Sequence, residues 1–197
     1  IFPINNVEFE RPNQEIAEIC GRYPGKFIGF AKHDPQTERG RIPALLRREV
    51  QSLGLKGLKL HKLPTREVLE AVAELRLPIL YHCSKVSEFH LLAQEYPRIP
   101  FIVAHLGSFA SRDWPEHVAA IDLPRRYPNV YLDTSSVVFF KFLEMAAREA
   151  GPGKLIFGSD GPELDSRVEL YKVKLLKLKP DQEAQVLGGN ILKLLPG

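Results

Sequence analysis

Three residues that could do acid–base or metal chemistry each follow a short apolar run of strand length. They are His82 after Ile79–Tyr81, His105 after Ile102–Ala104, and Asp160 after Ile156–Ser159. An imidazole titrates near neutrality, so a histidine can take up and release a proton at physiological pH. Two imidazoles and one carboxylate also make a ligand set that suits Zn²⁺ and its divalent neighbours. The sequence therefore predicts a site for metal or proton chemistry if these three side chains meet.

Apolar runs of strand length recur along the chain, and a stretch with helical spacing follows each of them, which predicts repeated strand–helix units and a parallel sheet. The seven predicted strands cover residues 1–4, 27–31, 55–60, 78–83, 100–105, 129–134 and 154–159. The predicted helices cover residues 14–23, 42–53, 66–75, 87–95, 115–126 and 139–149, and two tail helices cover 166–177 and 182–195. Gly188-Gly189-Asn190 marks a break in the last helix.

The fold class follows from how apolar these strands are and from where the polar residues stand. Nearly continuous apolar strands indicate burial on both faces of a parallel sheet. An open doubly wound sheet uses the same alternation of elements, but the candidate residues share the carboxyl ends of their strands, where (β/α)8 barrels build active sites. We therefore expect an α/β protein with a single barrel domain over residues 1–197. No shift in composition or long linker indicates a second domain.

Other polar residues are weaker candidates. Lys59 and His61 alternate onto one face of their strand and could bind substrate, and a carboxylated Lys59 could bridge two metals; a surface lysine beside a loop histidine is the alternative. Ser135 follows a strand and could bind substrate or cap the next helix. His90 and His117 lie at helical positions, where a solvated surface histidine is expected. A single histidine at the end of a strand is often only part of the core, whereas three residues at equivalent positions favour a site.

Composition excludes several function classes. The chain is 44% hydrophobic and 26% charged, close to the average of soluble globular proteins, and its two cysteines are too few for a disulfide framework. We expect a cytoplasmic protein, since neither a long apolar run nor a signal-peptide pattern is present. The net charge of +3 is scattered, which disfavours nucleic acid as a partner. A small-molecule substrate is expected, and a homo-oligomer is compatible with the sequence.

With these residues in place, the chain resembles the amidohydrolase-related (amidohydrolase 2) superfamily, in the branch of metal-dependent hydrolases and decarboxylases typified by aminocarboxymuconate-semialdehyde decarboxylase. The segments that carry the resemblance are residues 23–31, 54–61, 78–83, 103–107, 157–162 and 188–195. The resemblance implies a distorted (β/α)8 barrel that holds a divalent metal, usually zinc. It matches His82 and Asp160 to metal ligands and His105 to the acid–base histidine of the sixth strand.

One departure from the family pattern concerns its first strand. The family's His-x-His pair, which supplies two further metal ligands, is absent, because no two histidines here are separated by one residue. We expect that strand one lies upstream of Ile1 and that the chain begins in strand two. A genuine deletion is the alternative, and it would leave too few protein ligands for a usual catalytic zinc.

The leading functional hypothesis is metal-dependent hydrolysis of an ester, lactone or amide. Metal-activated water would attack the carbonyl, Asp160 would orient the water and accept its proton, and His105 would stabilise the oxyanion or protonate the leaving group. The same site could instead decarboxylate an unsaturated or aromatic acid without oxidation. A metal-free scaffold or binding barrel is a third option, and a binuclear site that uses carboxylated Lys59 is a fourth.

Overall fold

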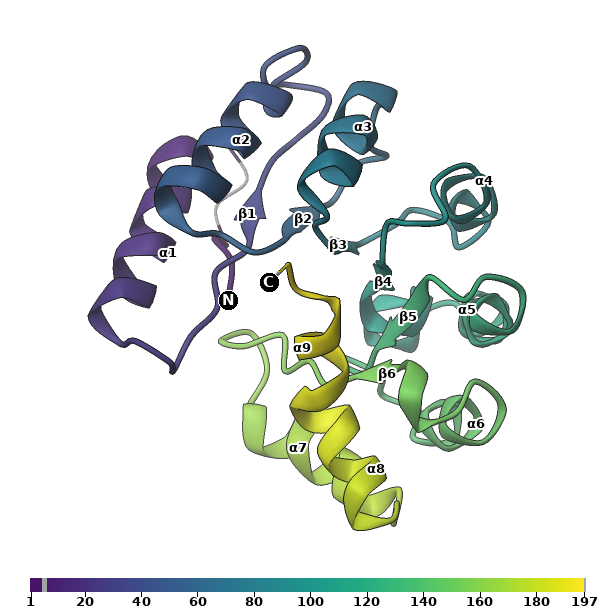
Figure 1. Cartoon of the computed structure of the whole chain (residues 1–197). Helices are drawn as coiled ribbons and strands as arrows, with labels where there is room; N and C mark the ends of the chain where they lie inside the picture. The colour runs from purple at the N-terminus through teal and green to yellow at the C-terminus, as the bar shows by residue number, and fades with distance from the viewer. Residues whose placement is uncertain (5–6, 197) are drawn as a thin grey trace. The chain divides into compact units, whose positions relative to one another are not determined.

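The computed structural model describes residues 1–4 and 7–196 and shows helices alternating with short parallel strands (Figure 1). The chain divides into two compact units. The first comprises Ile1–Tyr81 with the C-terminal residues from Leu195, and the second comprises His82–Leu194. Each unit contains three of the six strands assigned in the described residues.

The N-terminal unit is a three-stranded parallel sheet with a helix before each strand. Its strands are β1 (Ala31–Lys32), β2 (Leu58–Leu60) and β3 (Ile79–Tyr81), and its helices are α1 (Glu10–Arg22), α2 (Ile42–Leu53) and α3 (Arg66–Leu75). In the register of the sheet, Leu58 lies beside Ala31 on one side and beside Ile79 on the other. Leu58, Leu60 and their neighbours Ala31 and Ile79 are buried, as expected for parallel strands, and Lys32 and Lys59 are buried with them.

Helix α2 shows why the local sequence folds as it does. Ile42, Leu45, Leu46 and Glu49 recur at helical spacing and form its buried face. Pro43 stands in the first turn, where a missing N–H costs nothing. Gly54 ends the helix with a φ of 70° and donates its N–H to the Glu49 carbonyl, in a conformation that glycine adopts without a Cβ clash.

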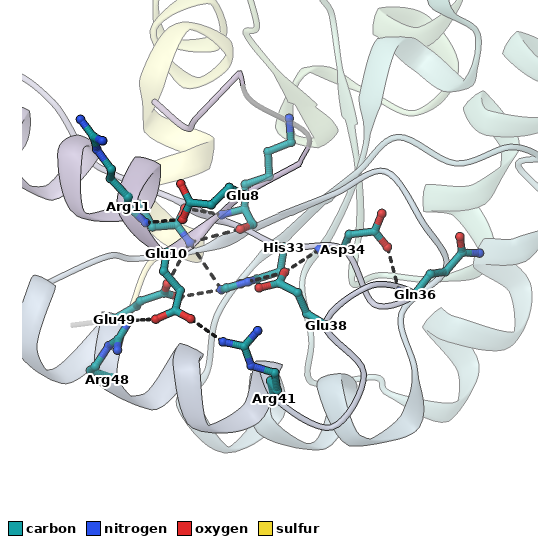
Figure 2. A network of polar contacts seen from close by, with 12 residues as sticks. Glu8, Glu10, Arg11, His33, Asp34, Gln36, Glu38, Arg41, Arg48 and Glu49 are labelled. Atoms are coloured by element: carbon teal, nitrogen blue, oxygen red, sulfur yellow. Dashed lines mark hydrogen bonds and ion pairs between the residues drawn. The ribbon is translucent and has the colours of Figure 1, made fainter.

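A buried polar cluster ties α1, α2 and the end of β1 together (Figure 2). His33 Nδ1 lies 2.9 Å from Glu38 Oε2, and His33 Nε2 lies 2.8 Å from Glu49 Oε2. Asn13 Nδ2 donates to Glu49 Oε1 at 2.8 Å. Burial alone lowers the pKa of His33, but the hydrogen bonds and charges of Glu38 and Glu49 outweigh it and raise the pKa to about 9. His33 is therefore a buried imidazolium at neutral pH.

The second unit repeats the strand–helix arrangement. Its parallel strands are β4 (Phe101–Val103), β5 (Val130–Asp133) and β6 (Leu155–Ile156), with Val103 beside Leu132 and Asp133 beside Ile156. Its helices are α4 (Glu88–Glu95), α5 (Trp114–Arg126), α6 (Lys141–Glu149), α7 (Ser166–Leu175), α8 (Pro180–Ala184) and α9 (Asn190–Leu194). In Figure 1, α4, α5 and α6 follow one another along one side of this sheet.

The side chain of Asn190 helps to join the chain's last helices to β6. Gln185–Gly189 forms a π-helical turn between α8 and α9, at the break predicted from the Gly-Gly pair. The buried Asn190 amide then donates to the carbonyls of Pro152 and Leu155, each at 2.8 Å. These bonds satisfy carbonyls at the start of β6, so the end of the chain supports the strand that leads to Asp160.

Predicted and observed elements differ mainly at the strands. The predicted strand over residues 1–4 is wrong: Ile1 exchanges hydrogen bonds with Ile28 and Phe30, but Pro3 has no N–H to continue a ladder. The strand predicted over residues 27–31 is shifted, since β1 shares only Ala31 with it and extends to Lys32. The remaining five predicted strands are present and shorter, and helices α2 and α3 match their predicted limits. In the described part of the chain, no helix is long and apolar enough to cross a membrane.

The His33 cluster predicts a stability loss at alkaline pH. Because the folded pKa is raised from 6.5 to about 9, the contribution is complete below pH 6.5 and is lost as pH rises to about 9. We expect the free energy of unfolding to fall by about 3 kcal/mol over this window, measured by urea denaturation. A His33→Gln variant should lose this slope, and a His90→Asn variant should keep it. Equal slopes in the wild type and the His33→Gln variant would contradict the assignment.

Candidate functional site

His82 and His105 lie side by side in the second unit. His82 directly follows β3 in sequence, and His105 lies in a 3₁₀ turn, Ala104–Gly107, that follows β4. Their ring centroids are 4.7 Å apart with the planes at 75°, an edge-to-face contact. The ring of Phe109 lies 5.2 Å from His105 and 6.2 Å from His82. Two of the three residues singled out from the sequence are therefore neighbours, with an aromatic ring beside both.

The backbone of His105 is strained. Its φ of 53° and ψ of 33° are left-handed, a region that costs a residue with a Cβ about 1–3 kcal/mol when the surroundings impose it. The His105 N–H donates to Asp133 Oδ2 at 2.9 Å, and the His105 carbonyl accepts the Ser108 N–H at 3.0 Å. These two bonds hold the turn.

Asp133 and Ser135 complete the surroundings of His105. Asp133 is the last residue of β5, and its Oδ2 accepts the Ser135 hydroxyl at 2.5 Å. Ser135 Oγ lies 2.9 Å from His105 Nδ1, while Asp133 Oδ2 lies 3.7 Å from that nitrogen. All three side chains are buried. Asp133 was missed in the sequence, although it ends an apolar run as His82 and His105 do.

Another histidine of this unit, His117, makes hydrogen bonds to the loop beside this group. His117 of α5 is fully buried, so the expectation that it is a solvated surface histidine is wrong. Its Nδ1 lies 2.8 Å from the Leu106 carbonyl, and its Nε2 lies 2.8 Å from Ser111 Oγ. Ser111 Oγ also accepts the Val138 N–H at 3.0 Å. Burial lowers the pKa of His117, which keeps it neutral, so it links the loop after β4 to the loop after β5.

The other histidine that was expected at the surface, His90, is also partly covered. It is half-buried in α4, and its Nδ1 lies 3.1 Å from the Tyr127 hydroxyl. Its place within the helix agrees with the sequence analysis, but it is not fully solvated. Because its ring contacts Tyr127, it serves as a comparison histidine.

Asp160 lies in the loop after β6, half-buried, with a φ of 51°. Its carbonyl accepts the Leu164 N–H at 3.2 Å, which closes the loop. Within the residues that the structure describes, no three His, Cys, Asp or Glu side chains form a group that could hold a metal ion. His82 and Asp160 suit a divalent metal in the kind of donor they offer, whereas a catalytic zinc usually has three protein ligands. Their assignment as metal ligands stays a prediction.

Lys59 and His61 belong to the N-terminal unit. Lys59 is buried in β2, with its Nζ 5.4 Å from the centroid of the Phe2 ring. His61 follows β2 and is exposed. Lys59 is therefore not a solvated surface lysine, but a role in substrate or metal binding stays a prediction for both residues.

Comparisons with known proteins agree on the family pattern and the fold. The family model described as Amidohydrolase matches residues 6–197. A search of curated proteins finds no match. A putative amidohydrolase from Staphylococcus aureus superposes with a TM-score of 0.76 at 16% identity, over 98% of this chain and 82% of that chain.

Two decarboxylases are also similar in structure. The 2,6-dihydroxybenzoate decarboxylase from Rhizobium has a TM-score of 0.72 at 19% identity, over 93% of this chain and 75% of that chain. A dihydroxybenzoic acid decarboxylase from a Polaromonas species, solved with bound manganese and the inhibitor 2-nitroresorcinol, has a TM-score of 0.72 at 18% identity, over 93% of this chain and 73% of that chain. At such identities the likeness shows the fold alone, and the barrel fold class expected from the sequence is confirmed.

The position of Asp133 depends on a glycine in the neighbouring loop. A Cβ on Gly158 would lie 1.8 Å from Asp133 Oδ1 and 3.2 Å from Ser135 Cβ, far inside van der Waals contact. We expect Gly158→Ala to displace the carboxylate, to lower the free energy of unfolding by about 1–3 kcal/mol and to shift the ring signals of His105 in NMR spectra. Gly153→Ala is the matched control, because nothing lies within 4 Å of its added Cβ. Unchanged His105 signals in Gly158→Ala would contradict this packing.

Proposed function

Because the chain belongs to the amidohydrolase family, we propose that it is an enzyme that hydrolyses an ester, lactone or amide bond in a small molecule with the help of a divalent metal. The observation that carries the proposal is the buried His105 imidazole, held by Ser135 and packed against His82. A histidine fixed in this way can move protons without having to reorient, and a proton carrier is what carbonyl hydrolysis needs.

The proposed metal ligands are His82 and Asp160. The family is metal-dependent, and the Polaromonas neighbour holds manganese. Neutral imidazole and carboxylate oxygen suit zinc and manganese alike, and zinc is the metal we propose. When bound, such a metal polarises a carbonyl and lowers the pKa of water toward about 7.

The protein's own groups divide the remaining work. Asp160 is proposed to orient the attacking water and to accept its proton. His105 is proposed to stabilise the developing oxyanion or to pass a proton to the leaving group. Phe109, whose ring lies beside both histidines, offers an apolar wall that would limit the entry of bulk water. Lys59 and His61 of the N-terminal unit are proposed to bind substrate. A cytoplasmic location is proposed from the composition of the chain.

A second candidate is non-oxidative decarboxylation of an aromatic or unsaturated acid. The specific observation that favours it is again Phe109, because an aromatic ring beside two imidazoles provides a surface on which an aromatic substrate can stack. In this reaction His105 would deliver a proton to the carbon that loses carbon dioxide. The two reactions share the site and differ in whether a water molecule is consumed.

Removing His82 tests the metal proposal. We expect the purified chain to contain one divalent metal ion by elemental analysis, and the His82→Ala variant to lose it together with activity, by about 10²-fold or more. His90→Ala is the control, since His90 is also half-buried but contacts Tyr127. A His82→Ala variant that kept both metal and activity would exclude His82 as a ligand. A wild type without metal would favour the scaffold, and two metals per chain would favour a site with carboxylated Lys59.

Product analysis separates the two reactions. The purified chain is given a panel of esters, lactones and amides, and in parallel a panel of hydroxylated aromatic acids. Hydrolysis predicts the uptake of oxygen from labelled water into the product, whereas decarboxylation predicts the release of carbon dioxide without it. Carbon dioxide release alone would replace hydrolysis by decarboxylation as the function.

A further inference from the structure

We propose that Asp133 and Ser135 are positioning residues that hold the neutral His105 imidazole in one tautomer, with its hydrogen on Nδ1 and its lone pair on Nε2. The inference rests on the order of donors and acceptors in a chain of three buried side chains. It deepens the proposed function, because it states in which direction His105 can first move a proton.

The first link in this chain is the Asp133 carboxylate. Its Oδ2 receives the His105 backbone N–H at 2.9 Å and faces Ser135 Oγ at 2.5 Å. Its Oδ1 receives the Ser135 backbone N–H at 3.3 Å. The carboxylate oxygens thus already accept two backbone N–H groups, and an ionised carboxylate can only accept hydrogen bonds. The Ser135 hydroxyl must therefore donate its single hydrogen to Asp133.

The second link is the Ser135 oxygen. Because the hydroxyl hydrogen is committed to Asp133, the oxygen can only accept from His105 Nδ1, which lies 2.9 Å away. Nδ1 must then carry a hydrogen. In a neutral imidazole this leaves Nε2 with the lone pair. At 3.7 Å from Nδ1, Asp133 Oδ2 is too far away to replace the serine as the direct acceptor.

His117 provides a comparison within the same unit. Its Nδ1 faces the Leu106 carbonyl at 2.8 Å, and a carbonyl can only accept, so the hydrogen must lie on Nδ1 there too. Ser111 meets His117 from the other side, at Nε2, where its hydroxyl can donate. The two serines thus have opposite roles: Ser135 accepts from a histidine and Ser111 donates to one.

The burial of the Ser135 side chain supports a role in holding His105 and not in binding a substrate. The residue is 2% exposed, and its hydroxyl is engaged by Asp133 and His105 at the same time. Binding substrate would require one of these bonds to break inside the protein, which leaves a buried polar group unsatisfied. We therefore propose a positioning role for Ser135, and the substrate-binding role expected from the sequence stays a prediction.

The tautomer determines the first proton step, and this part rests on the proposed function. With a lone pair on Nε2, neutral His105 must accept a proton at Nε2 before it can donate one there. The proton comes from the solvent or from an acidic group of the substrate, since the proton of the attacking water goes to Asp160, and it forms an imidazolium whose Nδ1–H stays on Ser135. His105 then gives the Nε2 proton to the leaving group, which restores the lone pair.

The tautomer can be measured directly in the full chain. NMR spectra that correlate ring nitrogens with the carbon-bound ring protons distinguish the two neutral tautomers and the imidazolium. In the wild type, recorded over a range of pH, we expect the neutral form of His105 to carry its hydrogen on Nδ1, as in His117. A neutral His105 with its hydrogen on Nε2, or a ring protonated on both nitrogens at every pH, would overturn the proposal.

Variants test which group sets the tautomer. In Ser135→Ala, His105 loses its acceptor at Nδ1, so we expect the hydrogen to shift to Nε2 in a large share of molecules. Ser111→Ala is the matched control, a second buried serine that contacts a histidine, and it should leave the His105 tautomer unchanged. Persistence of the Nδ1 hydrogen in Ser135→Ala would remove Ser135 from this role. If that variant does not fold, the wild-type spectrum alone still decides the tautomer.

Kinetics connects the tautomer to turnover. On whichever substrate proves active, Ser135→Ala should lower kcat by about 10- to 10²-fold with little change in KM, because positioning partners act on the reacting group. An unchanged kcat would overturn the positioning role in catalysis. The failure of the proposed function is distinguishable: a chain without metal or hydrolytic activity would refute that function, while the NMR spectra would still report the tautomer.

Discussion

The site depends on one buried carboxylate. Asp133 must have its oxygens satisfied inside the protein, since an unpaired buried charge costs several kcal/mol. It obtains its donors from the backbone N–H of His105 and from the backbone and hydroxyl of Ser135. The hydrogen bonds that satisfy the Asp133 carboxylate also hold His105 in its left-handed conformation, and they place the Ser135 hydroxyl beside the His105 ring. Gly158 leaves room for this arrangement because any side chain there would strike the carboxylate.

Three buried histidines show how the partner determines the state of the ring. His33 has a carboxylate on each nitrogen, which raises its pKa to about 9 and makes it a structural cation. The two ring nitrogens of His117 contact the Leu106 carbonyl and the Ser111 hydroxyl, and burial lowers the pKa of the ring. His117 is therefore neutral and has a structural role. His105 is separated from its carboxylate by a serine hydroxyl. Of these three rings, His105 is the one that also packs against a second imidazole, that of His82.

The sequence was most informative for helices and least for strand ends. Helices α2 and α3 have their predicted limits because an amphipathic repeat and a terminal residue such as Gly54 act within a few positions of each other. Most strands were predicted too long because a strand of a parallel sheet ends where its residues stop pairing with the neighbouring strands. The strand expected at residues 1–4 is absent for the same reason, since Pro3 cannot donate to a ladder.

The sequence by itself determined that His82 and His105 follow parallel strands, because apolar runs of strand length are local patterns. It also placed both residues at one edge of the sheet, since the carboxyl ends of parallel strands lie at the same edge. It also determined the family, from motifs that cover most of the chain. Only the tertiary structure decided that the side chains of Asp133 and Ser135 lie beside His105. These hydrogen bonds join residues 28 and 30 positions apart. No local pattern specifies such pairs, because their donors and acceptors meet only after the loops have packed.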